Sequence, residues 1–176
     1  ELENTASDYR AIGKIPYIIP GGGSNEIGAL GYVNCSREII DQSFEMNVPF
    51  DLIITATGSA GTQAGLAVGL KAQQSKVELL GIGVNAPKDS QESKVFELSK
   101  QTEIKLGCLS LVKSPDIVAN CDYIGDGYGF PDKRTLEAIN LFAKMEGILL
   151  DPVYSGKAAA GLIDLIKNGE LKKYKR

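Results

Sequence analysis

The sequence contains no histidine, and this absence excludes several kinds of catalytic site at once. Ser-His-Asp and Cys-His catalysis both need an imidazole, and so do metal centres built on histidine. We therefore predict no metal site. Any proton transfer must use Lys, Tyr, Asp, Glu or a cofactor.

Cysteine and long apolar runs are also scarce. Cys35, Cys108 and Cys121 form no Cys-x-x-Cys pair, and their odd number does not suggest a disulfide framework. No apolar run approaches the ~20 residues that a bilayer requires. The acidic first residues, 1–4, lack the apolar core of a secretory signal. We expect a cytoplasmic protein with no membrane partner.

Positive charge is not in excess either, because the net charge is −3. Nucleic-acid binding requires a basic stripe, so no nucleic-acid partner is expected. A length of 176 residues and a hydrophobic content of 43% are ordinary for one soluble domain.

Short apolar runs alternate with longer segments of helical periodicity, which is typical of βαβ units around a parallel sheet. A helix should begin at Ser24 or Asn25, and another should be capped by Asp132 and end at Gly147, with Leu136 facing inward. The strands are expected at 15–19, 51–57, 77–84 and 148–150, and further helices at 61–70, 87–106 (ended by Gly107) and 156–168. The sequence predicts an α/β fold with a doubly wound parallel sheet and a binding site at the carboxyl ends of the strands.

A glycine-rich loop, Thr-Gly-Ser-Ala-Gly-Thr-Gln-Ala-Gly at 57–65, follows a predicted buried strand and opens a helix. Backbone N–H groups and the helix dipole make such a turn suited to an anion. The predicted phosphate-binding residues are Gly58, Ser59, Ala60, Gly61 and Thr62. The alternative is a tight turn that binds no ligand.

Features that the loop lacks exclude some classes of phosphate ligand. No lysine lies between Lys14 and Lys71, so there is no Walker motif. The glycine spacing does not match a dinucleotide fingerprint, and Glu78 lies at the wrong end of the next strand to bind a ribose. A single phosphate group fits better than NAD.

The loop resembles the pyridoxal-phosphate (PLP) phosphate loop of fold-type II enzymes, and the likeness extends over the whole chain. Five further motifs carry the likeness: Pro-Tyr-Ile-Ile-Pro (16–20), Gly-Gly-Ser-Asn (22–25), Gly-Ala-Leu-Gly-Tyr (28–32), Gly-Tyr-Gly-Phe-Pro (127–131) and Glu-Gly-Ile-Leu-Leu-Asp-Pro-Val-Tyr-Ser-Gly-Lys (146–157). Together they resemble the D-cysteine desulfhydrase/1-aminocyclopropane-1-carboxylate deaminase family. The resemblance implies PLP as cofactor, a large PLP-binding domain of the tryptophan synthase β-like type, a small amino-acid substrate and a homodimer.

The resemblance also implies roles for three residues at loop ends. It assigns Tyr128 and Tyr154 to the substrate pocket, where phenols can hydrogen-bond the substrate or relay a proton. Taken alone, each tyrosine is more typical of a half-buried packing residue. Ser155 separates two branches, because the deaminases carry Glu directly after the tyrosine and the desulfhydrases carry Ser or Thr. A hydroxyl can hydrogen-bond a leaving thiolate that a carboxylate would repel, although Ser155 can equally cap the last helix.

Three functions remain open at this point. The first is β-elimination from D-cysteine to give pyruvate, ammonia and sulfide. The second is deamination of 1-aminocyclopropane-1-carboxylate, and the third is non-catalytic binding of a phosphate or metabolite. The resemblance puts the lysine that binds PLP covalently before Glu1 and a closing strand after Arg176. Residues 1–176 are therefore expected to form one incomplete, inactive cofactor-binding domain. Lys157 matches a different family lysine and is predicted to have a structural or electrostatic role.

Overall fold

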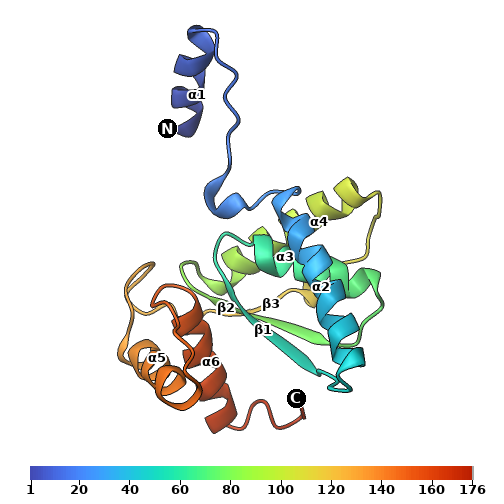
Figure 1. Cartoon of the computed structure of the whole chain (residues 1–176), viewed down its shortest axis with the longest axis vertical. Helices are drawn as coiled ribbons and strands as arrows, with labels where there is room; N and C mark the ends of the chain where they lie inside the picture. The colour runs from blue at the N-terminus through green and yellow to red at the C-terminus, as the bar shows by residue number, and fades with distance from the viewer. Residues whose placement is uncertain (176) are drawn as a thin grey trace.

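The computed structural model describes residues 1–175, which form a parallel three-stranded sheet covered by helices on both faces (Figure 1). The strands are β1 (Leu52–Thr57), β2 (Glu78–Gly83) and β3 (Val118–Asn120), in the order β1-β2-β3. Thr57 pairs with Gly83 and Ile82 with Asn120, so all three strands end at one edge of the sheet. The predicted doubly wound parallel fold is confirmed.

Five helices are arranged around this sheet, and a sixth stands apart. Helices α3 and α4 pack on one face, with α2 outside them against α3, and α6 packs on the other face, with α5 against α6 (Figure 1). At the N-terminus, α1 projects from the body on an extended segment. The bounds are α1 Leu2–Ala11, α2 Gly28–Glu45, α3 Gly61–Ala72, α4 Lys88–Leu106, α5 Lys133–Glu146 and α6 Ser155–Lys167. Within residues 1–175, none of the helices combines the length and apolar character that crossing a bilayer requires.

Helix ends follow the local signals of the sequence. The Asp132 carboxylate accepts a hydrogen bond from the Thr135 N–H at 2.8 Å and caps α5. Asn25 accepts from the Gly28 N–H at 2.8 Å at the start of α2. Gly107 and Gly147 end α4 and α5 in the left-handed conformation, at φ values of +73° and +67°. The boundaries at Gly107, Asp132 and Gly147 are confirmed, whereas α2 begins at Gly28 with Ile27 as its N-cap and not at Ser24 or Asn25.

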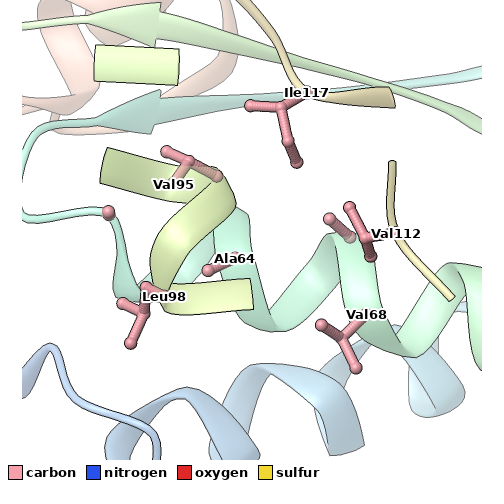
Figure 2. Close-up of a cluster of buried hydrophobic side chains, with 8 residues drawn as sticks. Ala64, Val68, Val95, Leu98, Val112 and Ile117 are labelled. Carbon is pink, nitrogen blue, oxygen red and sulfur yellow. The ribbon is translucent and has the colours of Figure 1, made fainter. Parts of the chain in front are cut away.

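Each face of the sheet has its own apolar core. Figure 2 shows the first, in which Ala64 and Val68 of α3 pack with Val95 and Leu98 of α4 and with Val112 and Ile117. On the opposite face, β2 contributes Ile82 to a cluster with Tyr123, Ala138, Ala159, Ala160 and Leu165. At ~25 cal/mol per Å² of buried apolar area, these two clusters are the main source of stability.

Helix α3 is held in place by unusually close packing against α2. A Cβ at Gly65 would lie 2.3 Å from the Ala29 carbonyl oxygen, and one at Gly69 would lie 1.9 Å from the Ser36 Oγ. Only glycine permits this approach. Gly65, which closes the glycine-rich motif, therefore serves helix packing, and this packing aligns the N-terminus of α3 at the carboxyl edge of the sheet.

Several predicted elements are wrong. Residues 15–19 are extended but not a strand, with Ile15 99% exposed, and Pro16 and Pro20 supply no N–H for a ladder. Residues 148–150 also pair with no strand, and Leu149 is 87% exposed. Leu136 is exposed instead of facing inward. Helix α1 and the short strand β3 were not predicted.

Candidate active site

The loops that follow the three strands meet at the carboxyl edge of the sheet. Because the strands are parallel and in register, the 58–60 loop, the 84–87 loop and residues 121–129 all lie on this side. The N-terminus of α3 opens onto this edge because α3 follows the 58–60 loop. The N-terminus of α6 lies at the same edge, since Lys157 in its first turn binds the carbonyls of Val84 and Gly127. The predicted site residues are thereby brought together at one place in the fold.

The 58–62 loop has the donor set of an anion site. Helix α3 begins at Gly61, so the N–H groups of Gly61, Thr62 and Gln63 have no intrahelical acceptor. Gly61 N–H donates to the Ser24 Oγ at 3.2 Å, and the Ser24 and Ser59 hydroxyls lie 2.8 Å apart. The loop offers N–H and O–H groups and contains no acidic residue. A phosphate group fits this chemistry.

Ala60 gives the loop its shape. Its φ of +82° lies in the left-handed region, which is unfavourable for a residue with a Cβ. Such strain costs of the order of 1 kcal/mol or more and persists only where neighbouring contacts hold the backbone. Ala60 is buried, and its methyl group belongs to the apolar core under the loop.

Helix α4 supports the loop through two polar side chains. The Lys94 ammonium donates to the Gly58 carbonyl at 3.1 Å, and the Gln91 amide donates to the Thr57 Oγ1 at 2.9 Å. Gln91 is fully buried, and its Oε1 has no partner among the described residues. Together with Ser24, these residues contact the loop, and none of the three was predicted as a site residue. Ser24 lies in a motif that carried the resemblance, whereas nothing local distinguishes Gln91 or Lys94.

Tyr128 and Tyr154 form a direct pair beside this loop. Their phenol oxygens are 2.8 Å apart, and their rings meet edge to face at 78° with centroids 5.8 Å apart. A Cβ at Gly58 would lie 3.4 Å from the Tyr154 ring, so the pair adjoins the glycine loop. Both side chains are partly open to solvent, at 53% and 37% exposure.

The pairing changes the acidity of one phenol. The hydrogen bond with Tyr128 raises the pKa of Tyr154 to about 12, with further contributions from burial and from the charges of Tyr128 and Asp151. Tyr154 is therefore protonated at neutral pH. A protonated phenol in a solvent-accessible pair can donate a hydrogen bond or a proton to a substrate.

Ser155 is bonded to Asp151, four residues earlier. Its hydroxyl donates to the Asp151 carboxylate and accepts from the Asp151 N–H at 2.8 Å. The same carboxylate accepts the N–H groups of Val153, Tyr154 and Ser155. Ser155 is the first residue of α6, but its hydroxyl bonds only Asp151 and accepts no N–H of α6, so the expected capping by Ser155 is wrong. The Asp151 carboxylate accepts the N–H groups at the helix start instead. A carboxylate is thus already close to the tyrosine pair.

Asp151 should make stability depend on pH. Burial alone would raise the pKa of its carboxyl, but the hydrogen bonds from Ser155, Tyr154 and Val153 outweigh burial and lower it from 3.8 to about 2. A lowered pKa in the folded state stabilises the fold above the unfolded value, and this contribution is lost as pH falls from about 4 to about 2. Because the carboxylate is partly exposed, Asp151→Asn should cost only about 1 kcal/mol at neutral pH.

Denaturant unfolding of wild type and Asp151→Asn at a series of pH values measures this effect. The difference in unfolding free energy should be constant above pH about 5 and shrink below about 4. Asp126→Asn, at an exposed aspartate of the neighbouring turn, is the control. A difference that persisted unchanged at low pH would show that Asp151 acts through packing and not through charge.

A family model described as "Pyridoxal-phosphate dependent enzyme" matches residues 1–176, and the chain belongs to this family. Among curated proteins it is 46% identical to "D-cysteine desulfhydrase" of Yersinia enterocolitica over 93% of its length, and equally to that of Serratia proteamaculans. A solved structure titled an "ACC deaminase homologue" matches with a TM-score of 0.87 and 39% identity, over 96% of this chain and 50% of the other. The chain spans about half the length (49%) of these curated relatives.

These findings confirm the predicted family, the fold-type II architecture and PLP as the cofactor. They do not test the site residues. Gly58, Ser59, Ala60, Gly61 and Thr62 remain predicted phosphate contacts, although their geometry suits that role. Tyr128, Tyr154 and Ser155 remain predicted pocket residues, and the first two are in contact with each other.

Proposed function

We propose that the intact protein catalyses β-elimination from D-cysteine, in which D-cysteine and water give pyruvate, ammonia and sulfide. The observation that carries this proposal is the Tyr128–Tyr154 pair beside the anion loop, followed by Ser155 instead of Glu. The relatives named D-cysteine desulfhydrase support it at 46% identity.

The chain's own residues divide the work between cofactor binding and hydrogen bonding to the substrate. The N–H groups at the start of α3, with the Ser59 and Thr62 hydroxyls, would hold the phosphate of PLP. When bound, PLP supplies an electron sink for the carbanion formed at Cα. Tyr154, protonated at neutral pH, would donate a hydrogen bond to the departing sulfur, and Tyr128 would orient it.

The role proposed for Ser155 is electrostatic. Since its hydroxyl is engaged by Asp151, a strong hydrogen bond from Ser155 to the leaving sulfur would require a rearrangement. The residue instead keeps a second negative charge away from the tyrosine pair. A glutamate here would stand beside Asp151 and disfavour a leaving thiolate.

Deamination of 1-aminocyclopropane-1-carboxylate is the second candidate. The solved homologue titled for that activity supports it, at 39% identity over almost the whole chain. The tyrosine pair would suit either reaction. Ser155 favours the elimination, because the resemblance assigns glutamate to this position in the deaminases.

Ser155→Glu in the intact protein tests this choice. A charge about 4 Å from the reacting group at an effective dielectric of ~20 is worth about 4 kcal/mol before screening. Partial exposure should reduce this, so sulfide and pyruvate release from D-cysteine should fall roughly ten- to a hundredfold. Ser155→Gln is the matched control, because glutamine has nearly the size of glutamate without its charge, and it should lose much less of the D-cysteine activity. Ser155→Thr, which keeps the hydroxyl, is a second control.

The same assays should include ammonia release from 1-aminocyclopropane-1-carboxylate. Equal desulfhydration by Ser155→Glu and Ser155→Gln would show that charge at position 155 does not reach the leaving group. Wild-type turnover of the cyclopropane substrate alone would establish the deaminase.

We also propose a cytoplasmic location for the enzyme. Three cysteines that are all free support it. The lysine that binds PLP and a closing strand are proposed to lie before Glu1 and after Arg176. Strand β1 is at an edge of the sheet in the described chain, and an apolar cavity of about 490 Å³ lies beside it. Its lining includes Leu52, Ile54, Leu162 and Ile166, and this open apolar edge supports the proposal of a closing strand. A homodimer is proposed for the intact enzyme, and sedimentation would test it.

A further inference from the structure

Lys157 is the largest fully buried side chain among the described residues, with 0% of its surface exposed. Its ammonium donates to the carbonyl oxygens of Ile124 at 2.6 Å, Gly127 at 2.8 Å and Val84 at 3.5 Å. Within residues 1–175 no carboxylate forms an ion pair with it. The charge is therefore balanced by neutral carbonyl dipoles, as a metal cation would be in a carbonyl cage.

This position is costly for a lysine in two ways. Burial removes the ammonium from water and thereby lowers the pKa of Lys157, although the negative charge of Asp132 acts to raise it. Lys157 is also the third residue of α6, where the positive end of the helix dipole disfavours a cation. An apolar side chain would avoid both costs. The lysine must therefore be retained for the carbonyl groups that it binds.

Those carbonyls belong to the turn that carries Tyr128. Gly125, Gly127 and Gly129 all have positive φ values, and the 124–129 turn has little hydrogen bonding of its own beyond Phe130 N–H to the Gly127 carbonyl. The Gly127 carbonyl that Lys157 binds immediately precedes Tyr128. Lys157 itself lies three residues after Tyr154, on the first turn of α6. One ammonium thus joins the segments that carry the two tyrosines to Val84, the residue that follows β2.

We propose that Lys157 is a positioning residue, an internal cation that holds the 124–129 turn so that the Tyr128 phenol meets the Tyr154 phenol. This role rests on the proposed function of the tyrosine pair. The ammonium touches neither phenol and does not take part in the chemistry directly. Its effect on the reaction passes through the geometry of the turn.

Lys157→Met in the intact protein removes the charge and keeps the side-chain length. Amide hydrogen exchange over 124–130, measured without substrate, should quicken at least about tenfold at Phe130, whose N–H bonds the Gly127 carbonyl, because the carbonyl anchors are lost. The kcat should fall about ten- to a hundredfold while KM changes little, since misplacement by about 1 Å has effects of that size. Lys167→Met, an exposed lysine in the last turn of the same helix, is the matched control and should change neither quantity.

Chemical rescue separates a positioning role from general destabilisation. Lys157→Ala leaves a space lined by three carbonyls, and ammonium or potassium ions should restore part of the exchange protection and part of kcat. Choline chloride at equal ionic strength should not. If Lys157→Met fails to fold, Lys157→Gln, which keeps two N–H donors, replaces it in the exchange comparison.

Two results would overturn the proposal. One is exchange over 124–130 within twofold of wild type in Lys157→Met. The other is loss of protection and activity in Lys157→Ala that ammonium and potassium leave unchanged, which indicates a merely structural lysine. Because the exchange measurement needs no substrate, it tests the turn even if D-cysteine proves to be the wrong substrate.

Discussion

Gly61→Val is expected to weaken PLP binding by the intact protein about a hundredfold. A Cβ at this position would lie 2.7 Å from the Ser24 Oγ and 3.3 Å from the Ser24 Cα. The structure directs this Cβ against Ser24. Since Ser24 binds the Gly61 N–H and contacts Ser59, its displacement would misalign the donors of the loop. Losing two hydrogen bonds to a charged group, about 1.5 kcal/mol each, corresponds to about a hundredfold.

Spectroscopic titration of the apo-protein with PLP measures this loss, with inorganic phosphate as competitor. Gly31→Val is the matched control, because a Cβ at Gly31, in α2, meets no atom within 4 Å. It should leave PLP affinity unchanged while imposing the same β-branched residue on a helix. Unchanged affinity in Gly61→Val would mean that the phosphate binds elsewhere than at this loop.

The fold was predictable where local chemistry decides it. β1 and β2 are β-branched or aliphatic runs that end in glycine or asparagine turns, and Asp132, Gly107 and Gly147 mark helix ends through their own backbone preferences. The predicted strands at 15–19 and 148–150 failed for the opposite reason. An extended apolar run becomes a strand only if another strand pairs with it, and local sequence does not reveal the partner.

The site was predictable to a similar extent. The glycine loop can be recognised from the sequence, because few functions other than anion binding require small residues directly between a strand and a helix. The contact between Tyr128 and Tyr154 joins residues 26 positions apart, and only the resemblance suggested that they share a pocket. The burial of Lys157 could not be inferred, since lysine is typical of surfaces and its carbonyl partners come from two other segments.

The large effect expected of Tyr154→Phe follows from the state of its phenol. The ring should stay beside Gly58, so PLP affinity should change little, while the hydrogen-bond donor is lost. Loss of one preorganised donor to a developing negative charge costs typically 10²–10³ in kcat, so kcat for sulfide release should fall about a hundredfold or more. Tyr32→Phe, at an exposed tyrosine of α2, is the control and should retain wild-type activity.

Tyr128→Phe should have a smaller effect, because this residue acts on Tyr154 instead of serving as the donor itself. Removing its hydroxyl abolishes the hydrogen bond that is the main cause of the raised pKa of Tyr154. Ultraviolet titration of Tyr128→Phe should therefore show the pKa of Tyr154 moving down from about 12 toward the ordinary value of 10.0. Since the two phenols act as one unit, the double variant should lose little more activity than Tyr154→Phe alone. Independent, multiplying losses would show that the tyrosines do not work as a pair, and full activity in Tyr154→Phe would require another hydrogen-bond donor.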